Sequence, residues 1–200
     1  MSHGVDPLSW HWGLDRGLPF HRYYLEMFLT EQRADIRGAI LEFQDPQYAS
    51  QFGGDQVRSI DILHVDDSNP AATLVGDLTR PNNLPSDRFD CIICTHVLHM
   101  IGDLKPAISE LHRMLRPGGV LLVAVPGVSM DGIDASELWR FTTAGLRWLL
   151  EPVFRAGNVD VRGYGNSLTA AAFASGRTMP AATSAPVRFV SPPVSRCSER

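Results

Sequence analysis

Arg116-Pro-Gly-Gly119 is followed at once by Val120-Leu-Leu-Val-Ala-Val125, which is the most strand-like run in the chain. The proline and the two glycines end a predicted helix over 104–115, whose leucines and isoleucine fall on one face. A helix that returns the chain to a buried apolar strand is the repeating unit of a parallel sheet with helices on its faces. This stretch therefore predicts an α/β fold.

Apolar runs on both sides of this stretch continue the alternation of predicted helices and strands. Another helix is predicted over 144–150, and strands are predicted over 39–43, 57–63, 72–75, 89–95, 159–163 and 169–173. Sheets of this kind bind ligands at the carboxyl ends of their strands, so the residues that follow each strand are the candidate site residues.

The composition indicates one compact domain. The chain has 200 residues, of which 44% are hydrophobic and 20% are charged, as in ordinary globular proteins. A net charge of −4 argues against a nucleic-acid partner, because affinity for a duplex depends on Lys and Arg near phosphates. The sequence has neither a signal-peptide pattern nor an apolar run of about 18 residues. We therefore expect a cytoplasmic protein with a small-molecule substrate and no membrane partner, and we allow for a homodimer.

The chain divides into three segments. Residues 1–38 form an entry segment with a predicted helix, and its apolar stripe consists of Tyr24, Leu25, Phe28 and Leu29. Residues 39–175 form the main domain. Residues 176–200 are rich in Pro, Ala, Ser and Thr, so we expect a disordered tail.

A family resemblance rests on three sequence motifs that follow one another along the chain. They are Gly76-Asp-Leu78, the run from Leu84-Pro through Phe89-Asp90 to His96-Val-Leu-His99, and Leu115-Arg-Pro-Gly-Gly119. The chain resembles the class I S-adenosylmethionine-dependent methyltransferases of the small-molecule, type 11-like kind. The resemblance implies a Rossmann-like fold with a mostly parallel seven-stranded sheet whose last strand is antiparallel. Asp15–Tyr24 and Trp139–Thr143 resemble a bacterial subgroup found beside sugar-modifying and polysaccharide enzymes.

The same resemblance implies S-adenosylmethionine as the cofactor and assigns residues to it. Asp61 occupies the place of the carboxylate that holds the ribose diol, Asp77 that of the adenine partner, and Glu42 that of the acid that fixes the loop after the first strand. The other implied cofactor neighbours are Phe43, Gln44, Ile62, Gly76, Leu78, Thr95 and His96, with Arg22 and Tyr24 from the entry helix, which is either a lid over the cofactor or a packing helix.

The loop after the first strand departs from the family pattern. The family has a glycine-rich loop there, but this chain has Glu42-Phe-Gln-Asp-Pro46, with Gln44 and Pro46 in place of two glycines. Either the loop takes another course and Gln44 contacts the cofactor, or the pocket has lost or changed its ligand.

His96 and His99 are the candidate catalytic residues, because a histidine can act as general base for a hydroxyl acceptor. The favoured base is His96, and the alternative is that both histidines are structural. We predict no metal site: Cys91 and Cys94 fall on opposite faces of a strand. The candidate acceptor-binding residues are Trp139, Arg140, Tyr164 and Asn166, with core packing as the alternative for the aromatic ones.

These observations predict methyl transfer to a small hydroxylated acceptor, a sugar or a specialised metabolite, most simply at oxygen. Two alternatives stay open on the same fold: an enzyme with non-methylating chemistry such as cyclisation, isomerisation or elimination, and a non-catalytic partner subunit.

Overall fold

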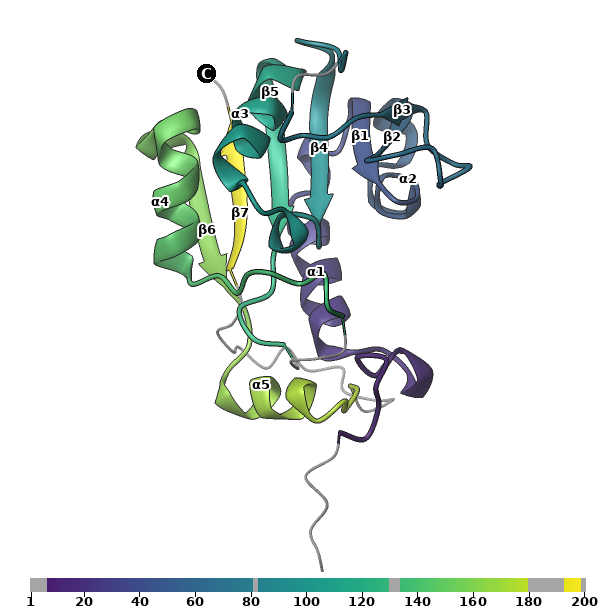
Figure 1. The fold of residues 1–200 in the computed structure, drawn as a ribbon, viewed down its shortest axis with the longest axis vertical. Coiled ribbons are helices and arrows are strands. Elements are labelled where there is room, and N and C mark those ends of the chain that lie inside the picture. Colours follow the sequence, from purple (N-terminus) through teal and green to yellow (C-terminus); the bar gives the residue numbers. More distant parts are fainter. Residues whose placement is uncertain (1–6, 81–82, 130–133, 180–192, 199–200) are drawn as a thin grey trace, which may run out of the picture.

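The computed structural model describes residues 7–80, 83–129, 134–179 and 193–198. Its centre is a seven-stranded sheet in the order β3-β2-β1-β4-β5-β7-β6 (Figure 1). Strands β1 to β5 pair in parallel, whereas β7 pairs antiparallel with β5 and β6. The strands are β1 (Gly38–Phe43), β2 (Val57–His64), β3 (Leu74–Val75), β4 (Phe89–Thr95), β5 (Leu115–Ala124), β6 (Val159–Gly163) and β7 (Pro193–Ser198). The predicted Rossmann-like parallel α/β sheet is confirmed.

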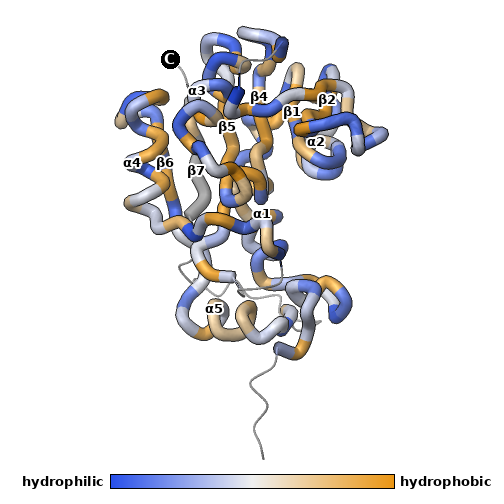
Figure 2. Tube along the Cα trace, in the orientation of Figure 1, coloured by the Kyte–Doolittle hydropathy of each residue, from blue (hydrophilic) through white to orange (hydrophobic). Residues whose placement is uncertain are grey.

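Helices cover both faces of the sheet. They are α1 (Phe20–Glu31), α2 (Gln47–Phe52), α3 (Leu104–Met114), α4 (Thr143–Phe154) and α5 (Ser167–Ala174), with 3-10 turns η1 (Leu14–Arg16), η2 (Arg33–Asp35), η3 (Gly54–Gln56), η4 (Leu98–Met100) and η5 (Ala156–Asn158). Helices α3 and α4 share one apolar cluster with Cys94, and α1 and α2 share the other with Cys91. The two cysteines therefore lie on opposite faces, as their spacing predicted. The central strands carry the most hydrophobic stretches (Figure 2).

The turn after α3 forms as its sequence indicates. Helix α3 ends at Met114 and β5 begins at the next residue. Gly118 has a φ of 81°, which glycine adopts without a steric penalty. This turn delivers Leu121 and Val123, both fully buried, to the middle of the sheet.

Two predictions about the C-terminal part are wrong. Residues 169–173 are not a strand but lie in α5, which begins with a capping box between Asn166 and Thr169 and continues through three alanines. The antiparallel strand instead comes from Pro193–Ser198, within the segment expected to be disordered. The rest of that tail, 180–192 and 199–200, lies outside the described residues.

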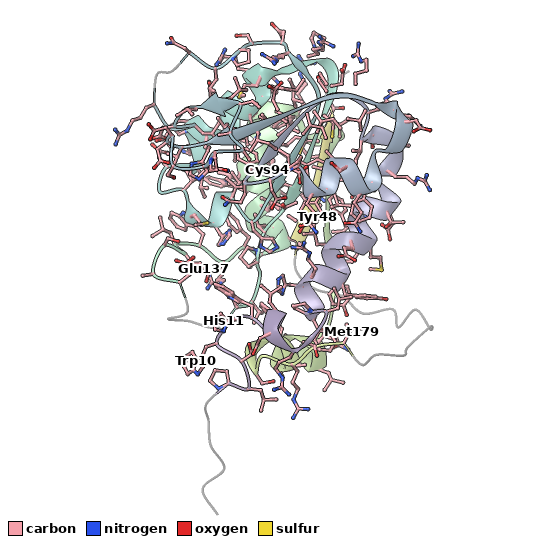
Figure 3. All side chains as sticks on the ribbon, turned by 90° about the vertical axis from the view of Figure 1, so that its right-hand side faces the viewer. Trp10, His11, Tyr48, Cys94, Glu137 and Met179 are labelled. Atoms are coloured by element: carbon pink, nitrogen blue, oxygen red, sulfur yellow. The ribbon has the colours of Figure 1, made fainter. Side chains whose placement is uncertain are left out.

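Residues 7–19 and α5 together form a cap at the carboxyl ends of the strands (Figure 1). Leu8 donates its backbone N–H to Ser175, and Met179 donates to Leu18. Trp10 and Met179 accordingly lie at the same end of the molecule (Figure 3). Nowhere in the described ranges is there a helix both long and apolar enough to span a bilayer.

Candidate functional site

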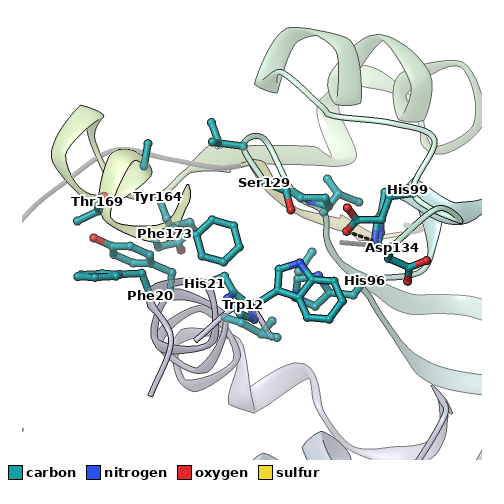
Figure 4. Close-up of a pocket in the computed structure, with 18 of the residues that line it drawn as sticks. Trp12, Phe20, His21, His96, His99, Ser129, Asp134, Tyr164, Thr169 and Phe173 are labelled. Atoms are coloured by element: carbon teal, nitrogen blue, oxygen red, sulfur yellow. Dashed lines mark ion pairs between the residues drawn. The ribbon is translucent and has the colours of Figure 1, made fainter. Parts of the chain in front are cut away.

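A cavity of about 270 Å³ lies between the carboxyl ends of β4 and β5 and the cap (Figure 4). Its walls come from four residues of α1, from the segments that follow β4 and β5, and from three residues of α5. The described lining residues are Trp12, Phe20, His21, Tyr24, Leu25, His96, His99, Met100, Ala124, Val125, Pro126, Val128, Ser129, Asp134, Glu137, Tyr164, Thr169, Ala170 and Phe173. The cavity therefore occupies the position at which parallel α/β sheets bind their ligands.

His96 enters this cavity because its backbone turns sharply after β4. The φ of His96 is 54°, in the left-handed region that residues other than glycine rarely adopt. Its backbone N–H donates to Ala124 O at 2.9 Å. The ring lies edge-on to two others, 5.5 Å from His21 and 5.9 Å from His99. Burial, with smaller contributions from these neighbours, lowers the pKa of His96 to about 3. His96 is therefore neutral and a weak base at physiological pH.

His99 has a charged partner that His96 lacks. The turn η4 buries its side chain, and Nε2 lies 3.3 Å from Glu137 Oε1. Glu137 in turn pairs with Arg140 at 2.6 Å. A carboxylate only accepts hydrogen bonds, so this pair places the imidazole proton on Nε2 and leaves Nδ1 as the acceptor.

His99 Nδ1 and His21 Nδ1 are both buried, and neither has a hydrogen-bond partner among the residues that the structure describes. His21 lies in the first turn of α1, and its ring packs 4.9 Å from Phe173 of α5. Burial above all, and then Arg22, lowers the pKa of His21 to about 4. An unpartnered buried polar atom costs about 1–3 kcal/mol, so two of them in one cavity indicate a site that a ligand completes.

Of the predicted acceptor-binding residues, only Tyr164 lines the cavity, together with the predicted cofactor neighbour Tyr24. The hydroxyl of Tyr164 donates to Glu31 at 3.0 Å. Trp139 is exposed and donates its indole N–H to Ile101 O at 2.8 Å. Trp139 and Arg140 do not line this cavity: the first binds a loop carbonyl and the second binds Glu137.

Asn166 is likewise not a wall residue. Its side chain accepts from Thr169 N at 2.8 Å and caps α5. Its contribution to the cavity is indirect, because it fixes the start of the helix that carries Thr169 and Phe173.

The predicted cofactor residues form a second group, at the ends of β1 to β3. Glu42 is buried, and its two carboxylate oxygens accept from Tyr48 N and Ala49 N, each at 2.9 Å. These bonds fix the loop between β1 and α2, as the family resemblance implied for this acid. Burial raises the pKa of Glu42 to about 7.

Gln44 adopts a left-handed backbone conformation, which favours glycine. Its φ is 69°, its side chain is exposed, and its carbonyl accepts from Asn69 Nδ2 at 2.7 Å. The loop after Phe43 therefore keeps a left-handed turn even without a glycine-rich sequence. Arg22 reaches the same region, with Nη2 2.5 Å from Gln47 Oε1 and the guanidinium 5.0 Å from the Tyr48 ring centre.

Asp61 does not end its strand, contrary to the prediction. Strand β2 continues to His64, and Leu41 rather than Glu42 pairs with Asp61, so the two acids point to opposite faces of the sheet. The Asp61 carboxylate accepts from Arg88 at 2.6 Å and from Thr73 Oγ1 at 2.9 Å. Thr73 also accepts from Ile62 N at 2.9 Å, so Asp61 and Ile62 hold the β2–β3 connection.

The residues after β3 lie where the chain leaves the sheet. Gly76 donates its N–H to His64 O at 2.9 Å, so it meets the carboxyl end of β2. Asp77 accepts from Thr79 N at 2.8 Å, and the bonds from Thr79 hold its pKa below the usual range. Leu78 is buried in the α3–α4 cluster, and Thr95 ends β4 half-buried beside His96.

Sequence reasoning missed His21 and Glu137. His21 stands in the first turn of a helix whose apolar stripe was recognised, but nothing in the local pattern turns it toward His96. Glu137 lies two residues before the highlighted Trp139, in a segment without periodicity. Their roles depend on contacts across 75 and 38 positions, respectively. Among the residues that the structure describes, no three His, Cys, Asp or Glu side chains converge as a metal site.

Comparisons with known proteins agree with this architecture. Residues 47–123 match the methyltransferase domain family. A SAM-dependent methyltransferase from Archaeoglobus fulgidus shares the fold with a TM-score of 0.60 and 11% identity over 90% of this chain and 94% of that one. The chain has the fold of a class I methyltransferase. A SAM-dependent methyltransferase from Thermotoga maritima gives a TM-score of 0.54 and 16% identity, over 96% of this chain and 100% of that one.

Two further similarities concern a protein with a different activity and a match over a short segment. The [4+2]-cyclase SpnF shares the methyltransferase fold with a TM-score of 0.51 and 17% identity, over 79% of this chain and 64% of SpnF. Among curated proteins, the probable polyketide synthase 39 of Dictyostelium discoideum is 32% identical over 62 residues, which are 30% of this chain and 2% of that protein. The family match therefore concerns a methyltransferase domain over 47–123, and the solved neighbours share its fold.

Proposed function

We propose that this protein transfers a methyl group from S-adenosylmethionine to a hydroxyl oxygen of a small molecule held in the cavity beneath the cap. The observation that carries the proposal is the His99–Glu137 pair, which sets an unpartnered imidazole nitrogen at the cavity, beside the carboxyl end of β4. The methyltransferase domain match over 47–123 supports the reaction class.

The cofactor fits the loop geometry after β1, because Gln44 retains the left-handed turn and Glu42 holds the following helix. We assign Phe43, Gln44, Gly76, Asp77 and Leu78 to its surroundings, with Arg22 near its carboxylate end. Asp61 is replaced in the ribose role by Asp66, an exposed acid that follows the end of β2. When bound, the cofactor supplies a methyl group already activated by its sulfonium.

In the chemical step, the acceptor oxygen would receive the methyl group that the cofactor supplies, with the cofactor's sulfur as the leaving group. The hydroxyl proton passes to His99 Nδ1, and the Glu137 carboxylate stabilises the imidazolium that forms. His96, the base favoured from the sequence, is the weaker candidate because burial keeps its pKa at about 3. We assign it to the cavity wall next to the reacting atoms.

The second candidate function is non-methylating chemistry on the same scaffold. The likeness of the fold to the [4+2]-cyclase SpnF and the presence of Pro46 in place of a loop glycine favour it. Such an enzyme would use the same cavity, but it would need no methyl donor.

Calorimetric titration with S-adenosylmethionine separates the two candidates. We expect a micromolar Kd for the wild-type protein and at least a tenfold loss of affinity for Asp66→Ala, with Asp61→Asn as the comparison that retains binding. Absence of any heat in the wild-type titration contradicts methyl transfer and leaves the second candidate. If Asp61→Asn abolishes binding in a folded protein while Asp66→Ala does not, the reassignment of the ribose partner is wrong.

A further inference from the structure

The walls of the cavity are mainly aromatic and apolar. Trp12, Phe20, Tyr24 and Phe173 supply rings from the cap and α1, while Val125 and Pro126 supply the opposite wall. Flat apolar surfaces of this kind match the faces of an aromatic molecule. They offer few hydrogen-bond partners to a ligand that carries hydroxyls on every side.

The size of the cavity limits the ligand. Its volume is about 270 Å³. Because an apolar cavity of about 150 Å³ holds one benzene ring, this space is suited to two fused rings or to one ring with substituents.

The charges around the cavity exclude most ionised ligands. None of the described residues that line it is Lys or Arg, while Asp134 and Glu137 both carry carboxylates at its edge. An anionic ligand would meet these carboxylates, and Arg140, which pairs with Glu137, does not line the cavity. A cationic ligand would lose its hydration against the mainly apolar walls, and the buried carboxylate of Glu137 is already paired with Arg140.

The polar atoms of the cavity match a hydroxyl group. His99 Nδ1 is a hydrogen-bond acceptor because Nε2–H faces Glu137, and His21 Nδ1 is either donor or acceptor. A hydroxyl is the smallest group that both donates and accepts. It can donate its one proton to His99 Nδ1 and accept from His21 Nδ1 when that nitrogen carries the proton. The aromatic body would then lie against Trp12 and Phe173.

We infer that the acceptor is an uncharged aromatic alcohol, of the phenol or naphthol class, with its hydroxyl directed at His99 Nδ1. This inference rests on the proposed function, since it names the substrate class of the same site. Of the two acceptor classes that the sequence suggested, a sugar and a specialised metabolite, it favours the second, because the walls are mainly aromatic and apolar.

The test is calorimetric titration of the wild-type protein with four probes near neutral pH: 2-naphthol, naphthalene, 2-naphthoate and methyl glucoside. We expect 2-naphthol to bind about fivefold more tightly than naphthalene, from one net hydrogen bond. We expect 2-naphthoate and methyl glucoside to bind at least tenfold more weakly than 2-naphthol. Tighter binding of either of these two probes overturns the inference.

Two variants of α5 locate the binding site. Ala170 lines the cavity, whereas Ala171 is exposed on the same helix. Ala170→Trp should weaken 2-naphthol binding at least tenfold, and Ala171→Trp should leave it unchanged, with thermal melting to confirm that both fold. Equal binding to both variants places the probe elsewhere and overturns the inference.

Failure of this inference is distinguishable from failure of the proposed function. S-adenosylmethionine is titrated into the same samples, and methyl transfer to 2-naphthol is followed by mass spectrometry. Binding of 2-naphthol without methylation supports the cavity assignment and contradicts methyl transfer to this class. Binding of S-adenosylmethionine together with tighter binding of methyl glucoside keeps the proposed function and overturns the aromatic acceptor.

Discussion

Replacing Glu137 by glutamine removes the charge that faces His99 while it keeps the size of the side chain. The carboxylate lies 3.3 Å from Nε2, and both side chains are nearly buried. At an effective dielectric constant of about 20, this distance corresponds to about 5 kcal/mol of attraction for an imidazolium, which is an upper bound. Because Arg140 also pairs with Glu137, we expect about half of this value, which is a fall in kcat of about 100-fold.

The KM for the acceptor should change much less than kcat, because His99 is neutral when the acceptor binds and becomes charged only as the proton moves. The pH profile should also shift. Glu137 raises the pKa of His99 against the larger effect of burial, so its removal lowers that pKa further. Activity requires neutral His99, and the acidic limb of the kcat profile should therefore move to lower pH in Glu137→Gln.

The assay is steady-state methylation of 2-naphthol by Glu137→Gln and by Glu151→Gln, a control at a half-buried pair with Arg147 on α4, away from the cavity lining. Histidine-selective nitrogen NMR follows the tautomer and the pKa of His99 without any need for turnover. A Glu137→Gln variant with unchanged kcat, or with its acidic limb moved to higher pH, would refute the assignment of Glu137 as the positioning residue for His99.

Three further predictions concern the second group of residues. Gln44→Gly should keep the stability within about 1 kcal/mol and retain S-adenosylmethionine binding, whereas Gln44→Pro should cost about 3 kcal/mol, because proline cannot adopt a φ of 69°; urea unfolding distinguishes them, and equal stability of the two variants contradicts the turn. Arg88→Ala should cost about 2 kcal/mol in urea unfolding by leaving the nearly buried Asp61 carboxylate without its cation, and a loss below about 0.5 kcal/mol would show that solvent replaces the arginine. The pKa of Glu42 is raised from 4.5 to about 7 in the folded state, so the folded protein binds more protons than the unfolded chain between these values. The contribution of Glu42 to the free energy of unfolding is therefore fully present below pH 4.5 and is lost as the pH rises to about 7. This loss amounts to about 3 kcal/mol in unfolding experiments. A free energy of unfolding that rises over this interval in wild type relative to Glu42→Gln contradicts the assignment.

Local patterns were sufficient for the central sheet. The apolar runs of β4 and β5 and the Pro-Gly-Gly turn between α3 and β5 are signals carried by neighbouring residues, and the structure follows them. Near the C-terminus the local signals conflicted, because Thr169–Phe173 is apolar enough for a buried strand although its alanines and the Asn166 cap favour a helix. A strand over Pro193–Ser198 carried no usable signal, since it forms only by pairing with β5 and β6.

The chain by itself determined a parallel α/β scaffold and indicated His96 and His99, because hydrophobic periodicity and strand-end position are encoded within short windows. Which histidine has a charged partner, where Asp61 directs its carboxylate and what lines the cavity were decided only by the tertiary structure. Glu137, which contacts His99, lies in a different loop. Arg88, which contacts Asp61, directly precedes β4, and His21, which contacts His96, lies in α1 near the start of the chain. Such contacts depend on how distant segments pack, and neither spacing nor residue type along the chain specifies that packing.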